Sequence, residues 1–401
     1  MAESSTEPIG SLYVHVPFCA QKCSYCAFFS EPSSGDLVNR YVKALIREME
    51  LVAGDLRPRT VFFGGGTPSL LNLSQWEKIL RAMDRLGLLG APEWTVECNP
   101  ATVSLDKAKL LRAHGVNRIS MGVQSLNEEL LDRLGRVHTR QMAFKSFDIL
   151  RQAGFENLNL DLMFAIPGQS LETWRDTLVE AIAMGSEHLS SYEVIYEEDT
   201  ALYGQLKAGE FDVDEDLACA MYDELVECAS TAGLRQYEVA NFARPVSDGA
   251  QGRALLNRID APAYACAHNI NYWRGGAFYG LGPSATSYVR GRRSKNWANT
   301  QLYCEQLERG RRAVESTEEL PPLARAGETA AFGLRMVAGW PFDRFRQVTG
   351  YDLRLGWADE MSQLAKQGWG KMNSENFQLT STGLRFADAA AQLFLRSSET
   401  K

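Results

Sequence analysis

LYVHVPFCAQKCSYC, residues 12–26, joins a short apolar run to three closely spaced cysteines. The run from Leu12 to Val16 has the β-type composition of a buried strand. Cys19, Cys23 and Cys26 follow it directly, with the spacing C-x-x-x-C-x-x-C. Three thiols within eight residues are typical of metal ligands and not of cysteine used as a small apolar side chain.

Two kinds of metal site compete for this loop, and unrelated buried thiols are the third reading. Structural zinc sites generally use paired ligands, four in all. The sequence near Cys26 offers no second pair and no obvious fourth ligand. The spacing instead suits an iron–sulfur cluster held by closely placed thiolates. Three protein ligands on a 4Fe-4S cluster leave one iron open for another group.

Strand-like and helix-like segments alternate from Leu12 to about Val194. Five β-like runs follow the first one: TVFFGG from Thr60, WTVEC from Trp94, RISMGV from Arg118, LNLDLMF from Leu158 and LSSYEVI from Leu189. Between them, apolar residues recur at helical spacing. Six βα units predict an α/β fold with a parallel sheet, a partial (βα)6 barrel rather than a closed barrel of eight units. Ligands of such sheets bind at the carboxyl ends of the strands.

The composition changes twice after this region. Residues 244–263 are rich in Pro, Gly, Asp and Arg and predict a surface loop. After Gly310 come three helix-like stretches, each closed by a glycine, then a short strand, a threonine cap and a last helix. We therefore expect a core over 1–243, a loop and aromatic segment over 244–310, and a small, mainly helical, winged-helix-like domain over 311–401.

The overall charge is acidic. The 401 residues include 42 Lys and Arg against 50 Asp and Glu, a net charge of −8. Such a chain has no general attraction for phosphate backbones, so no nucleic-acid partner is expected. The first ten residues lack the features of a signal peptide, and no apolar run approaches the roughly 18 residues that span a bilayer. These observations predict a cytoplasmic protein without a transmembrane segment, whose eight cysteines are thiols or metal ligands.

The cysteine motif in the first βα loop resembles that of the radical S-adenosyl-L-methionine (SAM) superfamily. The resemblance implies a 4Fe-4S cluster whose open iron binds SAM, an electron donor for that cluster, and cleavage of SAM to a 5′-deoxyadenosyl radical. Further motifs appear in order along nearly the whole chain: FFGGGTPS at 62–69, MGVQS at 121–125, DLMFAIPGQ at 161–169 and HNINYW at 268–273. Together they resemble the branch that includes oxygen-independent coproporphyrinogen III oxidase and the heme chaperone HemW.

Polar residues at predicted strand ends are the candidates for a SAM site. The glycines at 64–66 let backbone N–H groups approach a ligand. Asp161 lies inside the run LNLDLMF, where an ionised carboxylate is costly unless it is paired. The resemblance implies SAM contacts from Tyr13, Gly65, Gly66, Thr67, Glu97, Gln124, Arg136 and Asp161, with Tyr25 beside the cluster. His15 is interpreted as a hydrogen-bonded strand residue.

One position near the cysteines departs from the oxidase. The oxidase carries a further cysteine two positions after the third cluster ligand, whereas this chain has Phe28 there. HemW proteins similarly have an aromatic residue at that position. The oxidase also has a longer arm before its cluster, and only 18 residues precede Cys19 here. Both differences favour a chaperone over a decarboxylase.

The stretch HNINYW is the candidate heme site. A histidine among aromatic residues is more often a packed core residue, but imidazole is a common axial ligand of heme iron and aromatic faces pack well on a porphyrin. The resemblance to the heme-associated HemW motif implies heme binding by His268, Asn269, Tyr272 and Trp273. Cys266 is the competing axial ligand. We expect His268 in an accessible loop.

These observations predict a heme chaperone that binds heme and transfers it to apo-proteins such as respiratory enzymes, and no catalytic residue is assigned. Oxygen-independent coproporphyrinogen III oxidase activity is the alternative, and a radical SAM enzyme acting on an unrelated small substrate is a third possibility. Thr286 stands where many relatives have histidine. Cys98, Cys219, Cys228 and Cys304 are scattered and are interpreted as inert thiols.

Overall fold

The computed structural model describes residues 7–245 and 261–396. Most of the predicted loop at 244–263 lies outside these residues. The chain forms two compact units. The first comprises Met1–Glu187, Ser191–Ala218 and Ala277–Thr317, and the second comprises His188–Ser190, Cys219–Gly276 and Glu318–Lys401.

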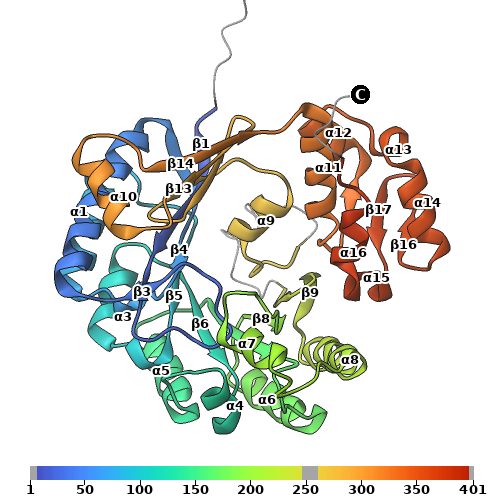
Figure 1. Ribbon diagram of the computed structural model, residues 1–401, viewed down its shortest axis with the longest axis horizontal. Coiled ribbons are helices and arrows are strands. Elements are labelled where there is room, and N and C mark those ends of the chain that lie inside the picture. Colours follow the sequence, from blue (N-terminus) through green and yellow to red (C-terminus); the bar gives the residue numbers. More distant parts are fainter. Residues whose placement is uncertain (1–6, 246–260, 397–401) are drawn as a thin grey trace, which may run out of the picture. The chain divides into compact units, whose positions relative to one another are not determined.

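An open parallel sheet with helices along its outer side forms the first unit (Figure 1). Its strands run in the order β11 (Tyr279–Leu281), β1 (Ile9–Val16), β4 (Leu56–Gly65), β5 (Glu93–Cys98), β6 (Arg118–Gln124) and β7 (Leu158–Phe164), all parallel. The sixth predicted run forms β8 (His188–Glu193), and Val194 after it donates its N–H to Phe164 O at 3.1 Å. The predicted α/β fold with a parallel sheet is confirmed.

Helices connect the strands of this unit as the alternating pattern predicted. They are α1 (Gly35–Val52), α2 (Leu73–Arg85), α3 (Leu105–Ala113), α4 (Glu128–Arg133), α5 (Arg140–Gln152), α6 (Leu171–Ala183) and α7 (Ala201–Lys207), with short 3-10 turns at Ala53–Asp55, Pro68–Leu70 and Pro100–Thr102. Helix α2 shows why they form where they do. Asn72 and Gln75 cap its start reciprocally. Its buried Trp76 packs on Phe63 of β4, with ring centroids 5.2 Å apart.

A late segment completes the first unit. It contains β12 (Thr286–Val289), β13 (Arg292–Asn296), α10 (Thr300–Glu308) and the start of β14 (Val314–Glu319). The fully buried carboxylate of Glu48 in α1 accepts hydrogen bonds from Gly282 N at 2.8 Å, Asn296 Nδ2 at 2.8 Å and Tyr303 Oη at 2.7 Å. A buried carboxylate is tolerated only when its oxygens are paired in this way, so the network fastens the late segment to α1.

The second unit is mainly helical. Its elements are α8 (Glu215–Thr231), β9 (Arg235–Glu238), β10 (Asn241–Ala243), α9 (Ala267–Trp273), α11 (Pro322–Gly333), α12 (Phe342–Thr349), α13 (Leu353–Gly356), α14 (Ala358–Lys366), α15 (Ser381–Arg385) and α16 (Ala387–Gln392). The predicted threonine cap is Thr380, whose side chain accepts from Gly383 N. Beyond the one strand expected, β17 (Asn376–Leu379), the structure adds β15 (Trp340–Pro341) and β16 (Gly370–Met372) on either side of it.

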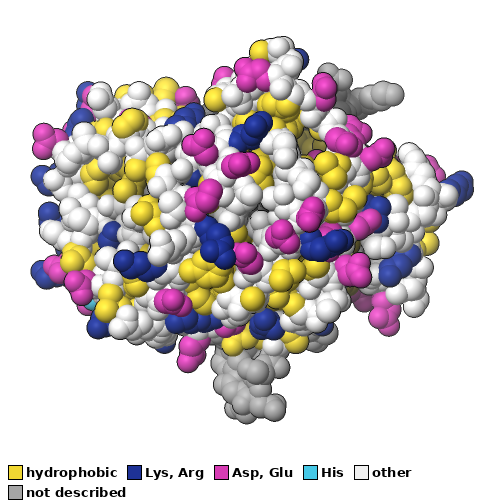
Figure 2. Space-filling view, turned by 90° about the horizontal axis from the view of Figure 1, so that it is seen from below, with side chains coloured by type: hydrophobic (Ala, Val, Ile, Leu, Met, Phe, Trp, Pro, Cys, Tyr) yellow, Lys and Arg dark blue, Asp and Glu magenta, His cyan; other side chains and the backbone are white. Residues whose placement is uncertain are grey.

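One face of the molecule and the hydropathy of its helices bear on what the protein can contact. On the face drawn in Figure 2, basic side chains are interspersed with acidic and apolar ones. None of the helices in 7–245 and 261–396 is long and apolar enough to cross a membrane.

Candidate functional site

The cysteine loop is fastened to the sheet at several points. Cys19, Cys23 and Cys26 are free, half-buried thiols. The loop begins in the short strand β2 (Phe18–Cys19) and ends where β3 (Glu31–Pro32) pairs with it. In between, Ser24 N donates to Leu134 O at 3.0 Å, and Ser24 O accepts from Leu202 N at 2.9 Å. These main-chain bonds hold the loop in place through its backbone.

The three thiols suit a multi-iron cluster better than a single ion. Among residues 7–245 and 261–396, no three His, Cys, Asp or Glu side chains converge as ligands of one metal ion. A tetrahedral zinc site needs such convergence, whereas a 4Fe-4S cluster bonds each thiolate to a different iron. Burial raises the pKa of the Cys26 thiol, and its electrostatic interaction with Cys23 and Cys19 raises it further. The donor set therefore fits the cluster.

A glycine turn after β4 lies directly against the cysteine loop. Gly66 N donates to Val16 O and Thr67 N to Phe18 O, both at 2.8 Å. A side chain at Gly66 would lie 2.7 Å from Phe18 O, and Gly65 has a φ of +103°. Only glycine satisfies both conditions. The turn brings Thr67 Oγ1 to 3.6 Å from Cys19 Sγ.

Two acidic side chains lie on strands β5 and β7, which flank β6 in the sheet, and the first of them contacts this turn. Glu97 of β5 accepts from Gly65 N at 3.1 Å. Asp161 of β7 accepts from Ser120 Oγ at 3.1 Å and from Asn159 Nδ2 at 2.8 Å. The bonds supply the pairing that an acid inside an apolar strand requires. Burial raises the pKa of Glu97 to about 8, and the charge of Asp161 adds to the rise.

Glu97 gives the ligand-free protein a pH-dependent stability. The unfolded carboxyl ionises near 4.5, whereas the folded one keeps its proton to about 8. The folded state therefore binds more protons across this range, and the free energy of unfolding falls as pH rises through it, by at most about 1.4 kcal/mol per pH unit. We expect Glu97→Gln to remove this contribution. Urea unfolding of both proteins at about pH 6 and about pH 8.5 measures the free energy of unfolding. If this free energy changes by the same amount between the two pH values in the wild type and in the variant, the assignment is wrong.

A partly buried arginine links the cysteine loop to the strand ends. Arg136 donates from Nη1 to Cys23 Sγ at 3.4 Å and from Nη2 to Gly122 O at 2.5 Å, and it also hydrogen bonds with Tyr25. Burial raises the pKa of Tyr25 well above its usual range, although Arg136 opposes the rise. Gln124, at the end of β6, has a φ of +66°. A non-glycine residue in this conformation is strained, as is common at binding sites.

The first strand contributes two ring side chains. His15 hydrogen bonds through Nδ1 with Tyr13 Oη at 3.0 Å and through Nε2 with Phe29 O at 2.9 Å. The interpretation of His15 as a hydrogen-bonded strand residue is confirmed. Sequence reasoning missed Ser120 and Asn159. The sequence held a signal for Asn159, because residues two apart share one face of a strand and Asn159 is two before Asp161. Ser120 lies opposite Asn159 in the strand register.

The HNINYW segment differs from its expected conformation. It forms helix α9, preceded by Cys266 at the N-cap position. His268 is only 1% exposed, so the expectation of an accessible loop is wrong. The physical reason is the i, i+4 spacing of His268 and Tyr272, which lets Nε2 and Oη hydrogen bond at 2.8 Å across one helical turn. Heme ligation through Nε2 of His268 would require this bond to open.

The competing ligand is also buried. Cys266 is fully buried, and its backbone N–H donates to Tyr237 Oη at 3.1 Å. Asn269 and Trp273, which share the i, i+4 spacing, are only partly buried. Thr286 pairs with Lys295 in the β12–β13 ladder.

The remaining four cysteines lie on other elements of the chain. Cys98 and Cys304 are buried, and Cys219 and Cys228 are partly buried in α8.

A parallel α/β sheet with three cysteines in its first βα loop is the arrangement of radical SAM proteins, and the family model of the radical SAM superfamily matches residues 13–181. The solved structure of coproporphyrinogen III oxidase (HemN) from Escherichia coli, a radical SAM enzyme, has the same fold: its TM-score is 0.81 at 21% identity, covering 97% of this chain and 90% of that one.

Curated relatives show which family of radical SAM proteins the chain resembles. The heme chaperone HemW of Bacillus subtilis (strain 168) is 32% identical over 364 residues, which are 89% of this chain and 92% of the relative. HemW of Escherichia coli (strain K12) is 32% identical over 390 residues, 96% of this chain and 98% of the relative. The chain belongs to the HemW family of radical SAM proteins.

Proposed function

We propose that this protein is a heme chaperone, which binds heme and passes it to apo-proteins such as respiratory enzymes. The observation that carries the proposal is Phe28, whose ring is 69% exposed two positions after Cys26. Any step that requires a thiol at this position cannot occur here. The proposal is supported by the HemW relatives, each named a heme chaperone and matched over most of its length.

We also propose a 4Fe-4S cluster on Cys19, Cys23 and Cys26, with SAM beside it and an electron-donor protein as partner. When bound, the cluster and SAM supply one-electron reductive chemistry. The chain's own groups are suited to hold them. The glycine turn presents backbone N–H groups, while Glu97 and Asp161 present acceptors for the amino and hydroxyl groups of SAM. Tyr13, Tyr25, Thr67, Gln124 and Arg136 complete the proposed SAM site.

The proposed heme site is α9, with His268 as axial ligand and Asn269, Tyr272 and Trp273 beside it. The helix offers an imidazole and two aromatic rings within two turns. The hydrogen bond between His268 and Tyr272 holds the imidazole in the ligand-free state. The Tyr272 hydroxyl competes with heme iron for this imidazole. Such competition suits a heme that must be released again, because re-forming the hydrogen bond favours release.

The test compares heme, the proposed ligand, with coproporphyrinogen III, the substrate of the alternative oxidase. Protein with a reconstituted cluster is incubated anaerobically with heme and, separately, with coproporphyrinogen III, SAM and a reductant. We expect a Soret band from bound heme, its transfer to an added apo-hemoprotein, and no decarboxylated porphyrinogen. Multiple turnovers of coproporphyrinogen III without heme binding would instead establish the oxidase, whose fold this chain shares.

A further inference from the structure

The end of α9 that carries Trp273 is bordered by two side chains that the motif does not include. Phe332 of α11 has a ring centroid 6.4 Å from that of Trp273, and its side chain is 45% exposed. The guanidinium carbon of Arg335, in the turn after α11, lies 4.8 Å from the centroid of the Trp273 ring. His268 is buried, whereas Trp273, Phe332 and Arg335 are all at least partly exposed and so are open to contact with a ligand.

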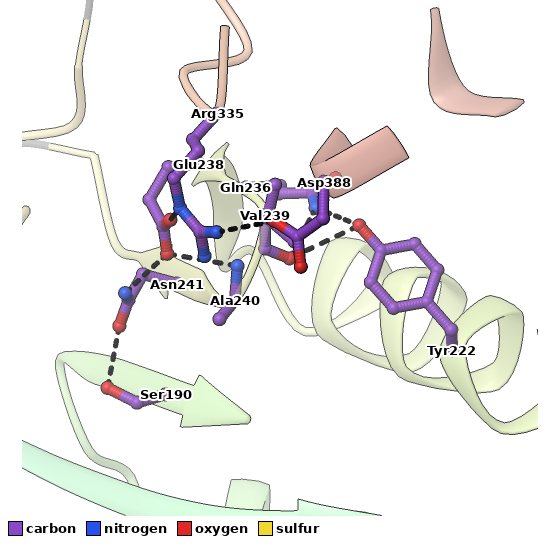
Figure 3. Close-up of polar contacts among 9 residues, drawn as sticks. All are labelled: Ser190, Tyr222, Gln236, Glu238, Val239, Ala240, Asn241, Arg335 and Asp388. Atoms are coloured by element: carbon purple, nitrogen blue, oxygen red, sulfur yellow. Dashed lines mark hydrogen bonds and ion pairs between the residues drawn. The ribbon is translucent and has the colours of Figure 1, made fainter. Parts of the chain in front are cut away.

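Arg335 is held from below by a buried carboxylate (Figure 3). Glu238, at the end of β9, is fully buried, and its Oε2 lies 3.6 Å from Arg335 Nε. Its other oxygen, Oε1, accepts from Ala240 N at 2.9 Å and from Asn241 Nδ2. This ion pair restricts the guanidinium, so less ordering is needed when a ligand binds.

The outer edge of the guanidinium has a weaker partner. Arg335 Nη1 lies 3.3 Å from Asp388 Oδ1 of α16, whose side chain is 86% exposed. Ion pairs with such an exposed carboxylate contribute little, since water solvates both partners. A second carboxylate that arrives on an apolar molecule can displace Asp388 at small cost.

Heme has the shape and charge that this group fits. It is a flat apolar macrocycle with two propionate carboxylates at one edge, and a guanidinium binds a carboxylate through paired hydrogen bonds. Aromatic rings pack against flat π systems. We propose that Arg335 binds a heme propionate in place of Asp388, and that the exposed ring of Phe332 packs against the macrocycle beside Trp273. This inference rests on the proposed heme binding and names the part of the ligand that is recognised.

The test separates the charge of the propionates from the rest of the ligand. The full-length, cluster-loaded protein is titrated with hemin and with hemin dimethyl ester, in which both propionates are uncharged. We expect the wild type to bind hemin about tenfold more tightly than the ester. Arg335→Ala should lose this preference by binding hemin more weakly while binding the ester as before. Arg335→Lys, which keeps the charge without the planar fork, should fall between them.

Two further variants guard against a folding defect. Asp388→Asn removes the competing carboxylate at an exposed position and should strengthen hemin binding roughly two- to threefold. Arg354 is the matched control, because it pairs with Asp352 at 2.8 Å and lies 5.0 Å from the Phe342 ring centroid. Arg354→Ala should keep the wild-type preference.

The outcomes distinguish the inference from the proposed function. If the wild type binds hemin but binds the ester equally well, or if Arg335→Ala keeps the full preference, propionate recognition by Arg335 is overturned and heme binding stands. If the wild type binds neither ligand, both proposals fall.

Discussion

Replacing Cys19, Cys23 and Cys26 together by alanine is expected to leave a protein that contains no iron and is colourless after anaerobic purification. In the proposed site each thiolate would supply one of the three protein bonds to the cluster, so removal of all three leaves the cluster without a protein ligand. Iron per chain and the visible absorption spectrum measure the result. Full iron retention would refute the cluster assignment.

The same variant separates loss of the cluster from loss of the fold. The loop is held by main-chain bonds from Ser24 to Leu134 and Leu202, which the substitutions do not touch. Helical content by circular dichroism should therefore stay near the wild-type value. Cys228→Ala is the matched control, since this thiol lies in α8 and bonds with Glu224 at 3.3 Å. It should retain all iron.

His268→Ala is expected to weaken heme binding by about tenfold or more, or to shift the Soret band, while iron in the cluster stays unchanged. The variant removes the proposed axial nitrogen. Tyr272→Phe should act in the opposite direction, because it deletes the hydroxyl that bonds to His268 Nε2 at 2.8 Å and so removes this competitor for the nitrogen. Heme titration followed at the Soret band measures both.

Opposite signs in these two variants are the decisive feature. A general packing defect in α9 would weaken heme binding in both. If neither substitution changes the spectrum or the affinity, His268 is not the ligand, and Cys266→Ala becomes the next variant to test. Cys266, a buried thiol at the N-cap of this helix, is the competing ligand, because a thiolate also ligates heme iron.

Local sequence was enough to predict the parallel sheet and the cysteine loop. Each of the six β-like runs is a strand, because consecutive apolar residues need cover on both faces. The tight turn at the glycines 64–66 was also predictable, since a positive φ and a close backbone approach exclude other residues there. Asp161 was identifiable from its cost inside an apolar run.

Features that depend on contacts between distant residues were not predictable. Pairing of Glu97 with Gly65 joins two strands, and support of Arg335 by Glu238 joins segments 97 positions apart. The HNINYW segment was predicted as a loop because six residues are too few to show a helical period, whereas burial of His268 stabilises the helix. The strands β15 and β16, of two and three residues, are too short for any alternation to show.

The Glu48 network also constrains the order in which a nascent chain can fold. Strand β1 is synthesised first, yet β11, its partner on one side, ends at Leu281. Glu48 bonds to the hydroxyl of Tyr303, which lies 255 residues after Glu48 in the chain. Until those segments leave the ribosome, one edge of β1 is unpaired and an acid in α1 lacks its donors. An open strand edge is an aggregation hazard, and contacts of such long range close slowly. The cysteine loop therefore emerges long before the sheet beside it is complete.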